Sequence, residues 1–122
     1  MKNSIHTFKV KEVVRVIDGD TVILKLDLGF YIDHTVYVRL LDVHAPEIRG
    51  KEKEEGIRIK HVLISFLRDH LEQGYSMTLG TKKTGKFGRW LGEILIDVDG
   101  IQVSANEFIN YHIDELEEVK ED

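Results

Sequence analysis

Residues 38–47, VRLLDVHAPE, predict the end of a strand at which polar side chains gather. Apolar residues alternate with Arg39 in the period of two that is typical of a half-buried strand. Pro46 has no N–H to donate to a ladder and is the only proline in the chain, so the strand is expected to end before it. His44 and Glu47 lie beside this end, where they either close the strand or line a site.

Hydrophobic periodicity on either side of this stretch predicts the remaining elements. Asp18-Gly19-Asp20 and Asp99-Gly100 are typical of turns between strands. Apolar residues at helical spacing predict a helix that ends before Gly74, and Ser104-Ala105-Asn106-Glu107 has the pattern of a capping box that opens a second helix. We expect strands at residues 6–16, 21–28 and 34–43, a helix at 59–71, strands at 75–82 and 89–97, and a helix at 104–113.

This order matches a five-stranded OB-fold barrel of the α+β class, in which the helix between strands 3 and 4 plugs one end. An SH3-like barrel is the alternative, but it does not usually carry a helix of about 15 residues there. We expect residues 1–113 to form this single domain. The charged segment 49–56 is expected to be mobile, and residues 114–122, with six carboxylates, to form a solvated acidic tail.

The composition narrows the classes of function. The chain has 122 residues and no cysteine, so disulfides and thiolate chemistry are not available. Its formal net charge of −5 argues against tight, sequence-independent binding to a long polyanion. No apolar run is long enough to cross a bilayer, and the start MKNSIHTFKV lacks the apolar segment of a signal peptide. A monomer without membrane contact is expected, and both a cytoplasmic protein and a mature secreted form stay open.

Four charged residues that are distant in sequence are expected to meet on one face of such a barrel: Asp20, Arg39, Glu47 and Arg89. Taken singly, each is more often an ordinary turn or surface residue. Together they provide two guanidinium groups for phosphate oxygens, one carboxylate for a hard cation and one carboxylate to act as a base. Metal-assisted hydrolysis of a phosphodiester needs this set of groups.

Three motifs resemble the staphylococcal nuclease (thermonuclease) family in their order and spacing: VIDGDTV at residues 16–22, VRLLDVHAPE at 38–47 and KFGRWLG at 86–92. The resemblance spans roughly residues 13–109, which is most of the predicted domain. It implies an OB barrel and calcium-dependent cleavage of single-stranded DNA and RNA, with little sequence preference, to leave 3′-phosphates.

The resemblance also implies roles for individual residues. Asp20 is similar to the family's first calcium-ligand aspartate, and Asp18 to an acid close to that ligand. Arg39 and Arg89 resemble the two phosphate-binding arginines, and Glu47 resembles the glutamate that activates water.

Three further positions match the family's substrate and metal contacts. Ala45 stands where the family often has threonine and uses the backbone carbonyl as a metal ligand, which alanine retains. Lys86 resembles the lysine of the nucleotide-contacting loop. Phe87 replaces a common tyrosine, so it loses a hydroxyl group but keeps a face on which a base can stack.

His44 is the largest departure, because the family's second metal-ligand aspartate falls on it. Calcium prefers oxygen ligands, whereas imidazole suits Mn²⁺, Co²⁺, Ni²⁺ or Zn²⁺ better. His44 is either not a ligand, which we rank first, or a ligand to a softer metal, or is replaced in that role by Asp42. A divalent cation is therefore expected: Ca²⁺ by resemblance, and Mn²⁺ or another transition metal if His44 binds it.

Two other classes of function stay open. A non-catalytic OB module would bind single-stranded nucleic acid or a protein partner through its arginines and Lys86, and Tyr31, Tyr37 and Phe87 are its candidate stacking residues. A structural or interaction domain would use the acidic tail as its contact. The retention of Glu47 together with both arginines favours the nuclease.

Overall fold

The computed structural model describes residues 6–84 and 89–121, and their side chains over residues 6–82 and 89–118. The elements are β1 (His6–Asp18), β2 (Thr21–Asp27), β3 (Asp33–Leu40), the 3₁₀ turn η1 (Gly50–Glu52), α1 (Lys53–Glu72), β4 (Ser76–Thr84), β5 (Trp90–Val98), β6 (Ile101–Ser104) and α2 (Ala105–Glu121).

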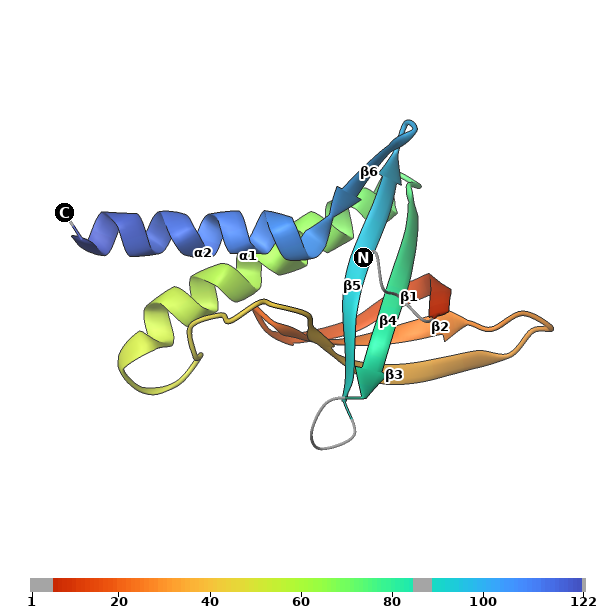
Figure 1. The fold of residues 1–122 in the computed structure, drawn as a ribbon, viewed down its shortest axis with the longest axis horizontal. Helices are drawn as coiled ribbons and strands as arrows, with labels where there is room; N and C mark the ends of the chain where they lie inside the picture. Colours follow the sequence, from red (N-terminus) through yellow and green to blue (C-terminus); the bar gives the residue numbers. More distant parts are fainter. Residues whose placement is uncertain (1–5, 85–88, 122) are drawn as a thin grey trace.

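Five strands form a closed barrel, which confirms the predicted OB-like fold of the α+β class (Figure 1). Neighbouring strands follow the order β3-β2-β1-β4-β5, and a parallel pairing of β3 with β5 joins the two edges of this sheet. The short strand β6, which periodicity did not predict, extends β5 as an antiparallel hairpin and leads directly into α2.

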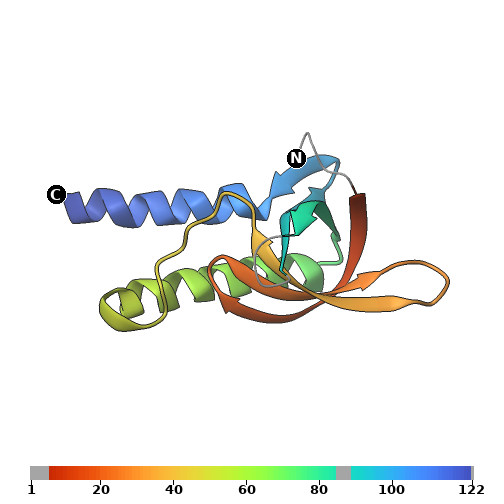
Figure 2. The same cartoon turned by 60° about the horizontal axis from the view of Figure 1, so that its bottom comes forward.

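The two helices lie together on one side of the barrel, and the β2–β3 hairpin projects on the other (Figures 1 and 2). On α1, Ile59, Leu63 and Leu67 are completely or almost completely buried. Their spacing of four residues keeps them on one helix face, which packs into the same core as the inward side chains of the strands. The helical periodicity in the sequence therefore marks the face of α1 that packs on the barrel.

The segment before α1 is more regular than the sequence predicts. Residues 49–56 were expected to be mobile, but they include η1 and the first turn of α1, so this expectation is wrong. The reason is tertiary, because Gly56 is buried against the backbone of Glu47. A charged, polar first turn carries no periodic signal for such a contact.

Two further boundaries differ from the prediction. β3 ends at Leu40 because the chain turns at Asp42, which has a φ of 59°, and the Val43 N–H donates to the Leu40 carbonyl at 3.3 Å. α2 continues to Glu121, so the residues expected to form an acidic tail are helical as far as the structure describes them. Leu116 packs on the core, which extends the apolar face of α2 beyond the expected end of the helix.

One buried amide joins α2 to the closure of the barrel. The Asn106 side chain is 4% exposed; its Oδ1 accepts the Ile94 N–H at 3.1 Å, and its Nδ2 donates to the carbonyls of Gly92 (3.0 Å) and Leu41 (3.1 Å). Asn106 belongs to the predicted capping box, whose Ser104 cap is confirmed by the Glu107 N–H donating to its Oγ at 3.2 Å. The side chain thus connects β5, the end of β3 and the start of α2.

Replacing Asn106 with alanine should destabilise the protein strongly, because three hydrogen bonds are lost and polar backbone groups become buried without this partner. We expect the free energy of unfolding to fall by about 3 kcal/mol in urea titrations. Asn110→Ala is the matched control, since its amide makes one exposed bond to the Asp42 carbonyl and its loss should cost less than about 1 kcal/mol. Equal losses in the two variants would contradict this account.

Two aromatic residues at the tip of the β2–β3 hairpin have backbone conformations that favour glycine. Phe30 and Tyr31 have φ values of 54° and 63°, and the Ile32 N–H donates to the Gly29 carbonyl across them at 2.9 Å. Positive φ at both central positions is the pattern of a type I′ turn, for which Asn-Gly is preferred. The two side chains are almost fully exposed, so packing within the described part of the chain does not offset this cost.

Replacing Phe30 with asparagine and Tyr31 with glycine should therefore stabilise the protein. We expect a gain of about 1 kcal/mol in the free energy of unfolding. The control replaces both residues with alanine, which removes the rings but keeps side chains that disfavour positive φ. A similar gain in the control would show that removal of the exposed rings, rather than relief of backbone strain, is responsible.

Candidate active site

Asp20 lies at the centre of a cluster formed by three separate segments. Its Oδ2 is 2.7 Å from the Arg39 Nη1 and accepts the Ala45 N–H at 3.0 Å. Its Oδ1 accepts the Thr21 hydroxyl at 3.0 Å. The side chains of Asp20 and Arg39 are 14% and 23% exposed, so a carboxylate and a guanidinium meet at the edge of the barrel with limited access to water.

Strand register and one close approach bring these residues together. The β2–β3 ladder pairs Thr21 with Arg39, and the Leu40 N–H donates to the Asp20 carbonyl at 2.8 Å. Gly19 lies so close to the neighbouring chain that an added Cβ would be 2.5 Å from Ile59 Cγ2 and 2.7 Å from the Ala45 Cβ. The glycine between the two aspartates is therefore required for close packing.

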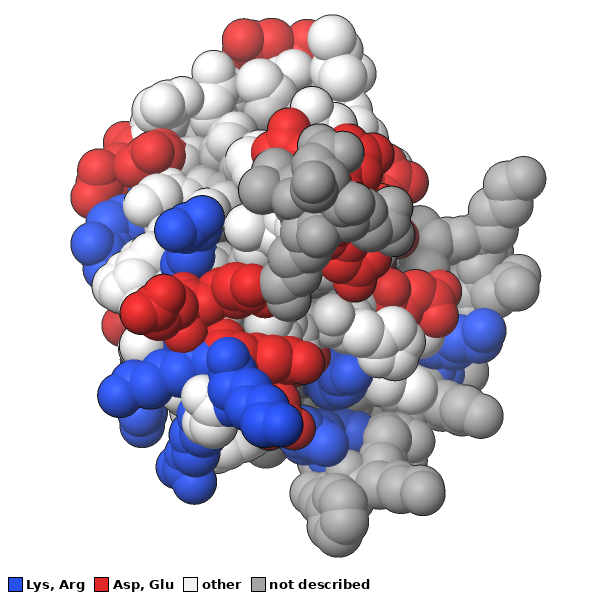
Figure 3. All heavy atoms as spheres, turned by 90° about the vertical axis from the view of Figure 1, so that its left-hand side faces the viewer, with Lys and Arg blue, Asp and Glu red and all other residues white. Residues whose placement is uncertain are grey.

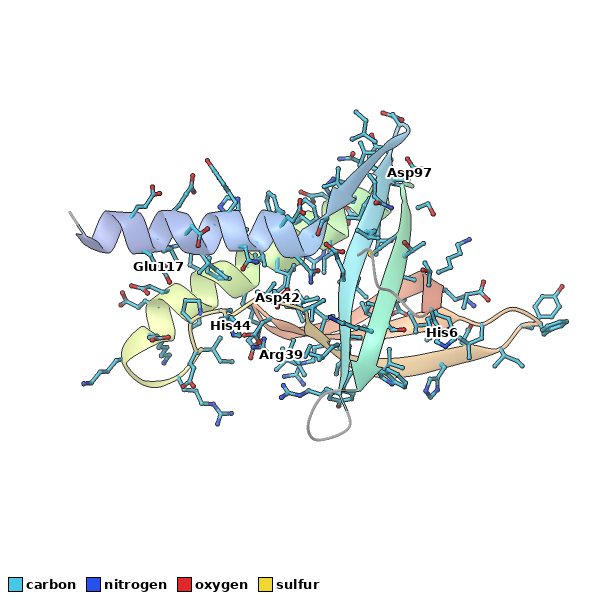
Figure 4. All side chains as sticks on the ribbon, in the orientation of Figure 1. His6, Arg39, Asp42, His44, Asp97 and Glu117 are labelled. Atoms are coloured by element: carbon cyan, nitrogen blue, oxygen red, sulfur yellow. The ribbon has the colours of Figure 1, made fainter. Side chains whose placement is uncertain are left out.

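His44 is exposed beside the same guanidinium, where Arg39 Nη2 and His44 Nδ1 are 3.4 Å apart. Because a guanidinium only donates, Nδ1 is the acceptor and the proton of the neutral ring lies on Nε2. The labelled side chains of Arg39 and His44 lie in one region near the start of α1 (Figure 4). In this arrangement Nδ1 accepts from Arg39, and the Nε2 N–H is left to donate to another partner.

Asp42 does not lie on an extended strand with His44, as its proposed role as a replacement ligand assumed. It is an exposed residue of the turn that follows β3, and its carbonyl accepts a hydrogen bond from Asn110 on α2 at 3.1 Å.

Glu47 and Arg89 lie in the same part of the fold but do not contact the cluster. The Glu47 carboxylate is exposed and has no hydrogen-bond or ion-pair partner among the described residues, although its backbone N–H donates to Glu52 at 3.1 Å. Arg89 directly precedes β5, whose first residues pair in parallel with the end of β3: Trp90 with Val38, and Leu91 with Arg39. Arg39 thus belongs to the strand pair that closes the barrel, and Arg89 lies directly before it. Lys86 and Phe87 lie outside the described residues.

Lys and Arg side chains gather on the lower part of the face that carries the start of α1, next to a band of Asp and Glu (Figure 3). The negative net charge of the chain is therefore unevenly distributed over this surface.

The pKa of Asp18 is raised to about 6. Burial is the largest cause, and a hydrogen bond to the neighbouring Asp20 carboxylate favours the protonated form. Asp18 also orders the turn, since its Oδ1 accepts the Asp20 N–H at 3.0 Å. The two carboxylates therefore share a small volume at the end of β1.

The donors present fit a divalent cation only in part. A calcium ion held by protein takes about six to eight oxygen ligands. Within the described residues, no three His, Cys, Asp or Glu side chains are grouped so that they could hold a metal. The pair of Asp18 and Asp20 fits a hard cation that keeps most of its water and shares an oxygen of a bound substrate, rather than an all-protein cage.

Sequence reasoning missed two residues that build this region. Thr21 is buried and orients Asp20 through its hydroxyl, and Asn106 holds the strand closure behind the cluster. Thr21 follows directly after the DGD turn, so its place beside Asp20 was visible in the sequence. No local pattern indicates the contacts of Asn106 with β5.

Comparison with known proteins finds a similarity to part of a bacterial protein. No family model matches the chain. The chain is 34% identical over 89 residues to a protein of Escherichia coli named Protein ParB, and the matched region is 72% of this chain and 42% of that protein. The chain thus spans less than half of the relative's length. Among the described residues, no helix is both long and apolar enough to cross a membrane.

Asp18→Asn should stabilise the protein at neutral pH in EDTA. The pKa of this carboxyl in the unfolded chain is near its ordinary value of 3.8, and folding raises it to about 6. The folded state therefore binds more protons between about pH 4 and pH 6, and stability from this group is lost as the pH rises through that window. Asparagine keeps the acceptor for the Asp20 N–H but carries no charge.

Thermal unfolding of both proteins at several pH values tests this effect. The variant should have the higher Tm at pH 7.5, and the difference should shrink toward zero near pH 4. Asp69→Asn, at an exposed position on α1, serves as the control and should show no such change with pH. A constant difference between Asp18→Asn and wild type would mean that titration of this carboxyl is not the cause.

Proposed function

We propose that the protein is a metal-assisted phosphodiesterase that hydrolyses DNA or RNA, with a preference for single strands and little sequence specificity. The observation that carries this proposal is the convergence of Asp20, Arg39 and the Ala45–Glu47 segment at the closure of an OB-like barrel. The three motifs similar to the thermonuclease family support the same chemistry, since they supply the residues of this cluster and of its surroundings.

Arg39 and Arg89 would bind the scissile phosphate. The guanidinium of Arg39 directs Nη1 to Asp20 and Nη2 to His44, and a guanidinium has five N–H donors in all. The donors that remain are held in place by these two contacts, which lowers the cost of orienting them toward phosphate oxygens. Such donors stabilise the negative charge that develops on the phosphoryl oxygens in the transition state.

Glu47 would act as the general base. Its carboxylate is exposed and has no partner among the described side chains, so it is available to accept a proton from a water molecule. Its backbone is held by the bond to Glu52 and by the close packing of Gly56 of α1. The position of the base thus depends on the helix as well as on the loop.

Asp20 and Asp18, with the Ala45 carbonyl, would hold the cation. A bound divalent cation supplies Lewis-acid polarisation of a phosphoryl oxygen. We propose a hydrated hard cation, Ca²⁺ or one of similar ligand preference. Mn²⁺ or Co²⁺ becomes the better ion if His44 binds it through Nε2, which requires the ring proton to move to Nδ1 and the contact with Arg39 to be lost.

A second candidate is a non-catalytic module that binds single-stranded nucleic acid. The observation that favours it is that Asp20 Oδ2 is already bonded to Arg39 and to the Ala45 N–H, which satisfies this oxygen without a cation. In this reading Arg39 and Arg89 bind a backbone phosphate, and no base is needed. Of the proposed stacking residues, Tyr37 is on β3 and half exposed, whereas Tyr31 is at the far tip of the β2–β3 hairpin.

Cleavage of a labelled single-stranded DNA with EDTA, Ca²⁺, Mn²⁺, Co²⁺ or Zn²⁺ separates the two candidates. We expect metal-dependent cleavage by the wild type and a kcat lower by about 100-fold or more in Glu47→Gln. The matched control is Glu54→Gln, which changes an exposed acid in the first turn of α1 and should leave kcat unchanged. The metal that supports the highest rate shows whether His44 is a ligand.

Binding without cleavage under all five conditions would support the module instead. In that case His44→Asp tests whether one ligand is missing, because it restores a carboxylate next to Arg39. Recovered cleavage would mean that the protein is a nuclease that lacks one metal ligand. Continued binding without cleavage would mean that the protein is a non-catalytic module that binds nucleic acid.

A further inference from the structure

A groove lined by basic residues lies between β1 and α1. It has a volume of about 360 Å³ and is lined by residues 13–16 of β1 and by Lys60, Ile64 and Arg68 of α1. Its floor is apolar, since Val14 is 45% exposed and Ile64 is half-buried. Its charged residues are Arg15, Lys60 and Arg68, and no Asp or Glu of the described chain lines it.

The local backbone explains why three cations face one groove. Lys60 and Arg68 are eight residues apart on α1, so they lie on the same helix face about 12 Å from each other. On β1 the register with β2 shifts between Val13 and Arg15, and an irregularity of this kind redirects side chains along a strand. Arg15 and the helix residues therefore form the two walls of the groove.

The three cations are not neutralised by neighbouring acids. Within the part of the chain that the structure describes, none of them lies within 4 Å of a carboxylate oxygen, whereas Lys11 and Lys25 on the neighbouring surface have acidic partners. A chain with a net charge of −5 thus lines this groove with three cations that form no ion pair among the described residues. Such a groove concentrates negative charge from solution.

Both walls of the groove end close in sequence to residues of the candidate site. Its β1 wall ends at Val16, two residues before Asp18, and its helix wall begins at Lys60, next to the Ile59 that packs against Gly19. If one phosphate of a nucleic-acid strand is bound near Arg39, the following phosphates would therefore contact this groove.

We propose that the β1–α1 groove binds the sugar-phosphate backbone of a single-stranded nucleic acid that extends from the candidate site. The substrate class rests on the proposed function. A concave strip with charges on both walls and an apolar floor fits a single extended polyanion. The charges lie on two facing elements, and planar guanidinium groups match phosphate oxygens in pairs.

The test replaces Arg15, Lys60 and Arg68 together with glutamine. Binding of a fluorescent 15-nucleotide oligo(dT) is measured in EDTA over a range of salt concentrations. We expect the affinity for oligo(dT) to fall by about tenfold or more. The slope of log K against log salt should be smaller by about 2, since each phosphate contact contributes about 0.7 for single strands. The control variant replaces Lys9, Lys11 and Lys25, which changes the net charge by the same amount outside the groove. It should keep most of the wild-type slope.

A second measurement separates this inference from the proposed function. The triple groove variant should cleave a dinucleotide at the wild-type rate and lose activity only on long strands, because a dinucleotide does not reach the groove. A different outcome is that the wild type shows no cleavage while the groove variant still loses oligo(dT) binding. That result would contradict the proposed nuclease activity and support the proposed role of the groove.

Equal binding by the two triple variants would overturn the groove proposal, and so would a wild type that does not bind oligo(dT). Polyglutamate and vesicles that contain phosphatidylserine are tested in parallel. Groove-dependent binding to either of them, without binding to oligo(dT), would assign the groove to an acidic protein or a membrane and would likewise overturn the proposal. Circular dichroism and thermal unfolding of each variant verify that the fold is retained.

Discussion

The parallel pairing of β3 with β5 is the constraint on which the rest of the structure depends. Without it, the sheet would have two open edges, and the residues at the end of β3 would have no fixed position relative to β5. The pairing is short, and the Asn106 side chain supports it by bonding to β5 on one side and to the end of β3 on the other. A buried amide with all these bonds satisfied favours one arrangement of the strands, because any shift leaves polar groups without partners.

The candidate site is a direct consequence of this closure. Asp20 enters from the turn after β1, Arg39 from β3, and Ala45 from the segment between β3 and α1. The β2–β3 ladder brings Arg39 to Asp20, and the segment after β3 adds the Ala45 N–H, so the cluster depends on contacts between separate parts of the chain. The ion pair is partly buried, and its stability depends on the additional hydrogen bonds that Thr21 and Ala45 provide to the carboxylate.

The same arrangement explains how an acidic protein can present a surface that attracts anions. Its charges are unevenly distributed: Arg39 is paired with Asp20, whereas no Asp or Glu of the described residues lines the β1–α1 groove. Net charge describes the field at long range, whereas a groove a few ångströms wide responds to the charges that line it. The composition alone, which argued against binding to a polyanion, averages over this difference.

The sequence by itself determined the fold class and the residues of the cluster. Alternation in the strands and the four-residue spacing of Ile59, Leu63 and Leu67 are local patterns, and each follows from which face of an element is buried. The DGD turn, the VRLLDVHAPE stretch and the Ser104 cap are local in the same sense. Asp20, Arg39, Glu47 and Arg89 were predicted to meet on one face, and of these four the structure joins Asp20 to Arg39 by an ion pair.

Only the tertiary structure decided how these residues are bonded and where the elements end. The first turn of α1 is stabilised by Gly56 against the Glu47 backbone, and the end of α2 by the packing of Leu116, and neither contact is visible in a local pattern. The hydrogen bonds of Asn106 join residues that are distant in the sequence. The groove likewise contains residues that are distant in the sequence, Arg15 and Arg68. Local periodicity reports which side of an element is buried, whereas the partner that it meets there is selected by the whole fold.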